Sequence, residues 1–197
     1  DKELIYDETD AIYVATATLD AYQTGTFAPR LHFVSKVSDA EYEMRIDGVA
    51  PNDEGVVTLE NFDCSIPHTL NLYKNGVEIE NAPIRFTYLN LVEVNYPSCN
   101  GSYYTPGTIR VTQANVAGYD SIYTAAYRYR GATAQGFEKK SYAVKLYEKD
   151  GVTSKDVEFL GLRDDNNWIL DAMAVDKACM RNRVSTDLWN DFANPPY

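Results

Sequence analysis

A glycine-bracketed loop followed by a lysine-bearing strand is the part of this sequence best suited to chemistry. Gly131 and Gly136 enclose a short polar connection, and glycines let a backbone approach a phosphate and aim its N–H groups at it. In the strand that follows, Ala143 and Lys145 share one face because side chains alternate along a strand. Kinases hold the α- and β-phosphates of a nucleotide with a similar pairing of a small residue and a lysine. The alternative is a surface hairpin whose lysines are solvated.

Lys140 is the second lysine of this strand, and it lies on the opposite face with Tyr142. The two lysines therefore serve one cleft only if the strand bulges. We favour Lys145 as the phosphate contact, with Lys140 as the substitute candidate. Arg130, at the end of the preceding strand, and Arg181, near the start of a helix, are candidate supports, and solvent-exposed arginines are the alternative.

No other cluster in the sequence points to a reaction. Asp164 and Asp165 are adjacent and are followed by two asparagines, which predicts a polar turn rather than a metal site. A sugar hydrolase would need two facing carboxylates, and none can be nominated. The three cysteines, Cys64, Cys99 and Cys179, lack metal-ligand spacing. Two possibilities stay open for them: a Cys64–Cys99 disulfide in an exported chain, or three buried thiols.

Two alternating strands must position the loop and its lysines. Residues 121–130 and 139–149 are expected to pair as antiparallel strands around the Gly131–Gly136 connection. Further along the chain, Asp176 is a favourable N-cap for a helix over residues 177–192. The apolar residues of that helix recur every four positions and are expected to be buried: Met180, Val184, Leu188 and Phe192.

Residues 1–87 read as a series of short strands. The best hairpin joins 69–73 to 77–79 through Asn75-Gly76, which supplies the positive φ values of a type I′ turn. Short strands at this spacing predict an immunoglobulin-like β-sandwich. Its expected core comprises Phe33, Tyr42, Met44, Ile46, Leu59, Leu70 and Leu72.

The uneven distribution of charged residues along the sequence supports a domain boundary near residue 87. The net charge is −11, and nearly all of it lies in residues 1–87, which hold 6 Lys and Arg against 16 Asp and Glu. An acidic unit repels nucleic acid, because affinity for DNA comes mainly from cations on phosphates. No stretch approaches the ~20 apolar residues of a membrane span, and no signal peptide is recognised. We therefore expect two domains, 1–87 and 88–197, that bind no nucleic acid and do not span a membrane.

A set of short motifs follows a fixed order through the second half of the chain: Arg130-Gly131, Lys139-Lys140-Ser141-Tyr142, Lys145-Leu146, Leu160-Gly161-Leu162, Trp168-Ile169-Leu170, Asp176 and Arg181-Asn182. In order and spacing they resemble the front part of the CotH family, secreted kinase-like proteins of spore coats. The resemblance covers roughly residues 88–192. It implies an accessory β-domain followed by the β-rich N-terminal lobe of an atypical kinase fold, so the expected fold class is mainly β with a C-terminal helix.

The resemblance also implies a function. The complete protein would be exported, to the cell surface, periplasm or extracellular space, and would transfer phosphate from ATP to a protein with the help of Mg²⁺. In this family the catalytic and metal-binding aspartates come from later in the chain, so these 197 residues are expected to contribute nucleotide contacts only: Gly131, Arg130, Lys140, Lys145 and Arg181. The alternative is a non-enzymatic surface module in which the kinase-like scaffold binds a partner protein or a glycan. If the lobe is incomplete, part of the helix stripe of Met180 to Phe192 is expected to stay exposed or to be covered by a second copy of the chain in a homodimer.

Overall fold

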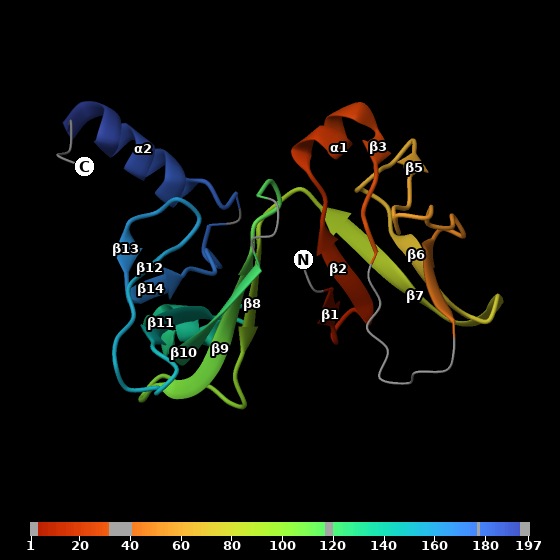
Figure 1. Ribbon diagram of the computed structural model, residues 1–197. Coiled ribbons are helices and arrows are strands. Elements are labelled where there is room, and N and C mark those ends of the chain that lie inside the picture. The colour runs from red at the N-terminus through yellow and green to blue at the C-terminus, as the bar shows by residue number, and fades with distance from the viewer. Residues whose placement is uncertain (1–3, 32–40, 117–119, 177, 194–197) are drawn as a thin grey trace. The chain divides into compact units, whose positions relative to one another are not determined.

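The protein is described by a computed structural model for residues 4–31, 41–116, 120–176 and 178–193, and it is mainly β with a helix near the C-terminus (Figure 1). This confirms the predicted fold class at that level. The chain divides into two compact units. Unit 1 comprises Asp1–Glu93 with Arg110–Ile122, and unit 2 comprises Val94–Ile109 with Tyr123–Tyr197. The predicted domain boundary near residue 87, and the independent folding of residues 1–87, stay predictions.

The N-terminal sheet has five strands in the order β1-β2-β7-β6-β4. These strands are β1 (Ile5–Asp7), β2 (Ile12–Thr16), β4 (Tyr42–Ile46), β6 (His68–Lys74) and β7 (Val77–Thr87). The β2–β7 pair is parallel, whereas the other neighbours are antiparallel. A two-stranded sheet joins β3 (Thr26–Phe27) to β5 (Leu59–Glu60). In the β6–β7 hairpin, Asn75 and Gly76 have φ values of 49° and 77°, which confirms the predicted turn.

The two N-terminal sheets share one hydrophobic core. Phe27 of β3 meets Phe86 of β7 edge-on, with ring centroids 5.1 Å apart, and Leu59 of β5 is buried in the same cluster. Of the predicted core residues, Ile46, Leu59 and Leu70 are buried, and Met44 packs against them. Tyr42 and Leu72 are half-buried, and Phe33 lies outside the described residues. The prediction missed several buried side chains: Ala17, Ala21, Val57, Phe62, Ile84 and Phe86.

A short helix in unit 1 contradicts the expectation of strands alone over residues 1–87. Helix α1 (Leu19–Thr24) starts after Thr18, whose hydroxyl oxygen accepts a hydrogen bond from the Ala21 N–H at 3.1 Å. It ends at Gly25, which has the left-handed backbone that favours glycine. Six residues are too few to show a helical periodicity in the sequence, so only the capping residues carried the signal.

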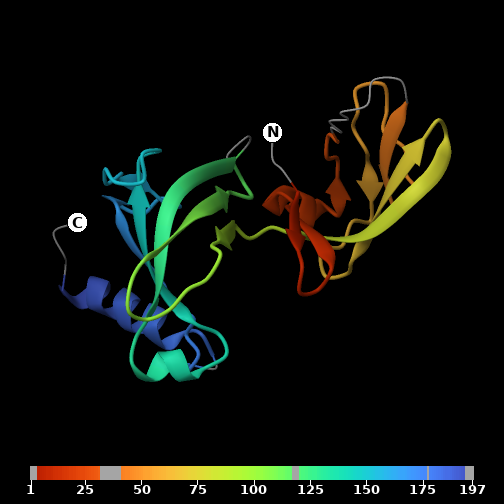
Figure 2. The same ribbon diagram turned by 90° about the horizontal axis from the view of Figure 1, so that it is seen from below.

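The C-terminal sheet also has five strands, in the order β14-β11-β10-β9-β8. They are β8 (Leu91–Asn95), β9 (Thr105–Thr112), β10 (Asp120–Arg130), β11 (Ser141–Tyr147) and β14 (Asn167–Leu170). Strands β10 and β11 are antiparallel neighbours, as predicted, and the 3₁₀-helix η1 (Thr133–Gly136) connects them (Figure 2). Strand β14 forms the edge of the sheet beside β11.

One face of this sheet is a hydrophobic core. Tyr127 lies opposite Val144, and Ala125 opposite Leu146, and all four are buried. The Tyr127 hydroxyl donates a hydrogen bond to the Thr108 carbonyl at 2.8 Å, so its polar end is satisfied. A Cβ at Gly107 would lie 2.2 Å from the Asn95 carbonyl oxygen. Only glycine therefore allows β9 to pass this close to the end of β8.

Two local predictions in the C-terminal half are wrong. Asp164–Asp165 is the two-residue strand β13, which pairs with β12 (Val157–Glu158) rather than forming a free turn. Helix α2 spans Arg181–Ala193 and so begins four residues later than expected, and the Cys179 N–H before it donates a hydrogen bond to the Asp176 carbonyl at 2.9 Å. The Asp176 carboxylate nevertheless accepts the Arg181 N–H at 2.6 Å and caps the helix from a distance.

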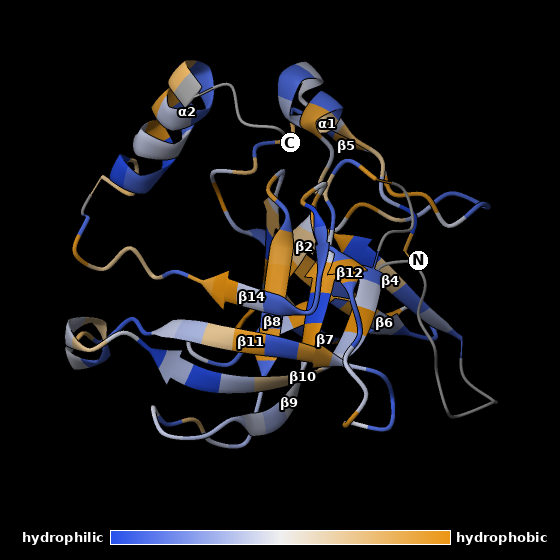
Figure 3. Ribbon diagram, turned by 90° about the vertical axis from the view of Figure 1, so that its left-hand side faces the viewer, coloured by the Kyte–Doolittle hydropathy of each residue, from blue (hydrophilic) through white to orange (hydrophobic). Residues whose placement is uncertain are grey.

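The apolar stripe of α2 is exposed rather than buried, which is the alternative expected for an incomplete lobe. Apolar positions recur along the helix (Figure 3). The exposed fraction of the residue is 46% at Val184 and 84% at Phe192, and Met180 and Leu188 fall between these values. The stripe has the periodicity of a buried helix face, but within the described residues no side chains cover it.

Leu146→Ala should destabilise unit 2 by roughly 2–5 kcal/mol, because Leu146 is 0% exposed and its truncation leaves a cavity. Both tryptophans, Trp168 and Trp189, lie in unit 2, so urea unfolding followed by tryptophan fluorescence reports on this unit alone. Val152→Ala, at a 79% exposed position, is the control and should change stability by less than about 0.5 kcal/mol. Equal effects of the two substitutions would contradict the assigned core.

Candidate functional site

The two faces of the β10–β11 hairpin have opposite character. Because Tyr127, Val144 and Leu146 point into the core, the residues that alternate with them point the other way. Ala126 lies opposite Lys145, and Arg128 lies opposite Ala143. We call the side that carries Arg128, Arg130, Ala143 and Lys145 the Lys145 face. The register places Ala143 and Lys145 together on it, as the alternation in the sequence predicts.

Two cations of the Lys145 face meet one aromatic ring. Tyr104, immediately before β9, is half-buried, and its ring centroid lies 4.9 Å from Lys145 Nζ and 5.0 Å from Arg128 Cζ. Among the described residues, Lys145 and Arg128 form no ion pair with a carboxylate. Neither Arg128 nor Tyr104 was predicted from the sequence. The register of the hairpin, counted from the Arg130–Ser141 pair, would have placed Arg128 on this face.

Lys140 projects on the other face of the hairpin and stabilises the connecting loop. Its ammonium group donates hydrogen bonds to the carbonyls of Gln135 and Phe137, at 2.7 Å and 2.5 Å, and lies 5.9 Å from the centroid of the Tyr129 ring. The structure therefore separates Lys140 from Lys145, as the alternation predicts, and uses two of the three Lys140 donors locally.

The glycine-bracketed loop is folded on itself. Gly131 has a φ of 84°, and a Cβ there would lie 3.1 Å from the Cβ of Ala134. The Gln135 side-chain amide donates to the Gly131 carbonyl at 2.6 Å, and weak backbone bonds of 3.4 Å close the turn. The requirement for glycine at position 131 is therefore explained by the left-handed turn itself.

Arg130 lies at the exposed end of β10, opposite Ser141, and acts electrostatically on Asp171. The Asp171 carboxylate accepts hydrogen bonds from the Met173 N–H and from the Ser141 hydroxyl, both at 3.1 Å. The Met173 bond is the main reason why the pKa of Asp171 is held below its ordinary value, and the Ser141 bond and the Arg130 charge contribute. Asn182 of α2 donates to the same carboxylate at 3.2 Å, so Asp171 connects this end of the hairpin to the helix.

Arg181 is paired with Asp176 rather than with a residue of the Lys145 face. Its Nε lies 3.6 Å from Asp176 Oδ1, and its side chain is 78% exposed. The pKa of Asp176 is lowered mainly by the Arg181 backbone N–H and also by the arginine charge. Of the five predicted contacts, the structure thus places Lys145 and Arg130 on one strand face, Gly131 at its end, and Lys140 and Arg181 elsewhere.

Neither a metal cluster nor a disulfide is present among the described residues. No group of three or more His, Cys, Asp or Glu side chains there could hold a metal ion. Cys64 and Cys99 are half-buried free thiols, and Cys179 is an exposed one. Within the same part of the chain, no helix is long and apolar enough to cross a bilayer.

Comparison with known proteins matches residues 127–196 to the family model described as CotH kinase protein. This confirms the resemblance inferred from the sequence, over a segment that begins within β10 rather than near residue 88. The matched segment contains Arg128, Gly131, Lys140, Lys145 and Arg181, whereas Tyr104 lies before it. No curated protein and no solved structure shows a significant match to the chain.

Asp171→Ala should destabilise unit 2 by about 1 kcal/mol at pH 7, because the Met173, Ser141 and Asn182 donors lose their shared acceptor. Since the folded-state pKa of Asp171 lies below its ordinary value of 3.8, its ionised form stabilises the fold above that pH. This contribution disappears as the pH falls through the lower folded-state pKa.

Urea unfolding of wild type and variant at pH 7 and near pH 3 measures this effect. The stability difference should shrink on acidification. Glu138→Ala is the control, because Glu138 is exposed and its carboxylate has no hydrogen bond or ion pair among the described residues. A stability difference for Asp171→Ala that is unchanged between the two pH values would exclude a role for the ionised carboxylate.

Proposed function

We propose that the chain contributes the nucleotide-binding part of a CotH-like protein kinase and that the Lys145 face holds the phosphates of ATP. The observation that carries this proposal is the coincidence of two independent findings. Residues 127–196 match the CotH kinase family, and the matched segment presents Lys145 beside Arg128 with no carboxylate partner for either among the described residues. A phosphate group is the counter-charge that such a pair of cations attracts.

The described side chains can bind the phosphates of ATP but do not form a binding site for Mg²⁺. Lys145 and Arg128 offer charged donors for phosphate oxygens, and Arg130 adds a third positive charge on the same face. By contrast, the described residues contain no carboxylate cluster for Mg²⁺, which would neutralise the phosphates when bound. From the similarity to the CotH family, we expect the metal-binding and catalytic aspartates to come from another part of the complete protein, and this chain alone to bind nucleotide weakly without transferring phosphate.

Lys140, Gly131 and Arg181 have supporting roles in this proposal. Lys140 fixes the loop through its two carbonyl contacts, and Gly131 permits the left-handed turn at the end of β10. Arg181 is exposed and could exchange its Asp176 contact for a phosphate or for an acidic group of the complete domain. Lys145 is accordingly the principal phosphate contact. The other cations add to the positive electrostatic potential around it.

Residues 1–87 are proposed to be an accessory immunoglobulin-like domain. Strands β4, β6 and β7 are neighbours in one sheet, with the order that strands C, F and G have in an immunoglobulin sandwich, and the β3–β5 pair corresponds to strands B and E of the opposite sheet. The shared core of Phe27, Leu59 and Phe86 supports this reading. Such domains are common on cell surfaces, so we place the protein outside the cytoplasm, with a protein as phosphate acceptor.

A non-enzymatic surface module is the second candidate. It is favoured by the uncovered apolar stripe of α2, whose Leu188 and Phe192 side chains are exposed. Contiguous apolar surface of this kind is typical of an interaction site. In this alternative the kinase-like scaffold binds a protein partner, or a second copy of the chain, through the helix.

Lys145→Ala should weaken ATP binding by the chain roughly tenfold, because one charge-assisted contact to a phosphate is lost. Titration calorimetry at low ionic strength measures this. The control is Lys149→Ala, which removes the same charge from an exposed position just beyond the end of β11. In the complete protein, Lys145→Ala should abolish transfer of labelled phosphate to protein while leaving the fold intact.

Three outcomes of these experiments differ in meaning. Wild-type activity of the full-length Lys145→Ala protein would make Lys140 the candidate phosphate contact. Equal losses of affinity for Lys145→Ala and Lys149→Ala would indicate that only net charge matters. A complete protein that neither binds ATP nor labels any protein would leave the surface-module alternative.

A further inference from the structure

The Arg128 side chain is in an unusual environment for a charged group. Its Nε atom is buried and makes no hydrogen bond, and its guanidinium group lies over the Tyr104 ring. A buried donor that lacks an acceptor costs free energy, so such a group in a folded protein needs an explanation. The π face of a tyrosine attracts a cation, but it does not accept the in-plane hydrogen bonds that a guanidinium group can donate.

Other cations of unit 2 show that carboxylates are available to them. Arg163 pairs with Asp165 at 2.7 Å, Arg183 with Asp187 at 2.9 Å, and Lys155 with Glu148 at 2.9 Å. Arg128 and Lys145 have no carboxylate partner among the described residues. Unlike the exposed Lys149, both are half-buried, and they lie on the same strand face and share one ring.

Within the sheet, these two cations are separated by small side chains. Lys145 lies opposite Ala126, and Arg128 lies opposite Ala143, so alanines occupy the other two corners of this square of four residues. Directly opposed residues in antiparallel strands have Cβ atoms about 5 Å apart, and diagonal ones about 7–8 Å. Lys145 and Arg128 are diagonal neighbours, and a phosphate group bound between them would contact both side chains.

We propose that Arg128 is a second phosphate-binding residue and forms a two-cation site with Lys145, and that the Tyr104 ring holds both side chains in place. This inference rests on the proposed nucleotide-binding function and specifies its ligand as a polyphosphate. Arg128 supplies a planar fork of donors that matches two phosphate oxygens, whereas Lys145 acts as a point charge. Tyr104 acts as a positioning residue, because its ring limits the freedom of both cations before a ligand arrives.

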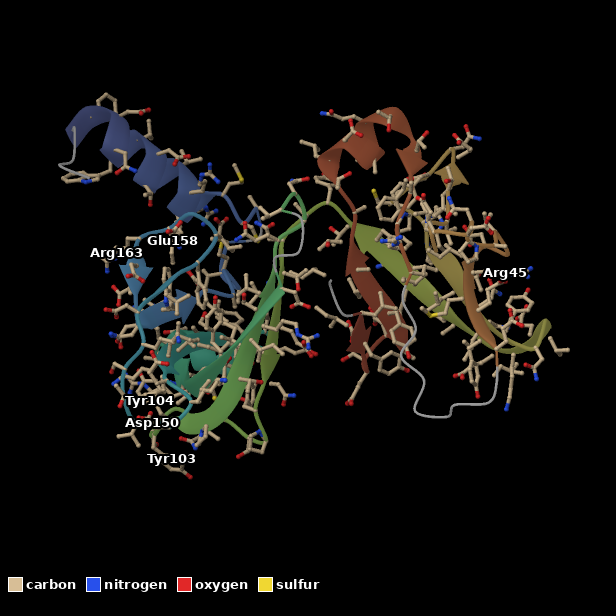
Figure 4. The ribbon with its side chains drawn as sticks, viewed as in Figure 1. Arg45, Tyr103, Tyr104, Asp150, Glu158 and Arg163 are labelled. Atoms are coloured by element: carbon tan, nitrogen blue, oxygen red, sulfur yellow. The ribbon has the colours of Figure 1, made fainter. Side chains whose placement is uncertain are left out.

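The test uses the 197-residue chain with two probes, ATP and inorganic tripolyphosphate, and adenosine as the uncharged comparison. Arg128→Gln should weaken binding of both polyphosphates roughly ten- to a hundredfold and should not affect adenosine. Arg163→Gln is the matched control, because Arg163 is 82% exposed and pairs with Asp165. Figure 4 shows Arg163 well apart from Tyr104 within unit 2. Tyr104→Phe should retain affinity, and Tyr104→Leu should lower it.

A second measurement does not depend on the folding of a variant. In wild-type protein labelled with ¹⁵N, the Arg128 side-chain Nε–H resonance should shift on titration with tripolyphosphate, along with the backbone signals of β10 and β11. Saturation without any movement of the Arg128 resonance would overturn the proposal. The same conclusion would follow if Arg128→Gln and Arg163→Gln had equal affinities for tripolyphosphate.

The outcomes separate this inference from the proposed function. If the Arg128→Gln variant binds ATP with the affinity of the wild type, the function stands and the Arg128 assignment fails. If tripolyphosphate binds in an Arg128-dependent manner but ATP binds no better than tripolyphosphate, the two-cation site stands and the preference for a nucleotide fails. If neither polyphosphate binds, both proposals fail together.

Discussion

The antiparallel register of β10 and β11 is the constraint on which the candidate site depends. Tyr127 and Leu146 are fully buried on one side of this hairpin, so Arg128 and Lys145 must lie on the other. A slip of one residue would expose the buried side chains and drive two cations into the core. Because burying an unpaired charge is very costly, the same packing that stabilises the sheet also fixes the position of the cations.

The positive charge of the Lys145 face arises because the strand register brings together cations from two strands. It does not arise from a cluster of charged residues that are close in sequence. Ion pairs elsewhere in unit 2 are short-range along the chain, such as Arg163 with Asp165 and Arg183 with Asp187. The Lys145 face instead combines residues from β10 and β11 with a tyrosine that precedes β9. An acidic chain can therefore present a localised positive site, because the sheet keeps its carboxylates away from these two cations.

Polar contacts at the start of helix α2 connect it to the rest of unit 2. Asp176 caps its first N–H groups, and Asp171 accepts a hydrogen bond from Asn182. Its apolar side chains make little contribution, since Leu188 and Phe192 are exposed. The helix is thus oriented by carboxylates while its apolar stripe stays available. This arrangement suits either proposal for the protein, because both the remainder of a kinase domain and a binding partner could cover the stripe.

Local patterns in the sequence determined much of the fold. Alternation predicted the β10–β11 pair, and Asn75-Gly76 predicted its hairpin, because both signals depend only on neighbouring residues. The CotH resemblance was likewise readable from ordered motifs, and the family match over residues 127–196 bears it out. Alternation also separated Lys145 from Lys140. Six residues were too few to reveal α1, and periodicity alone could not show whether the α2 stripe has a partner to pack against.

Only the tertiary structure decided what each polar side chain contacts. It assigned Lys140 to the loop carbonyls and Arg181 to Asp176, and it brought Tyr104 to Arg128 and Lys145 from more than twenty positions earlier in the chain. Sequence spacing specifies which face of a strand a residue occupies. It does not specify which residues of other strands lie beside it, because that depends on the order and register of strands that are distant in sequence.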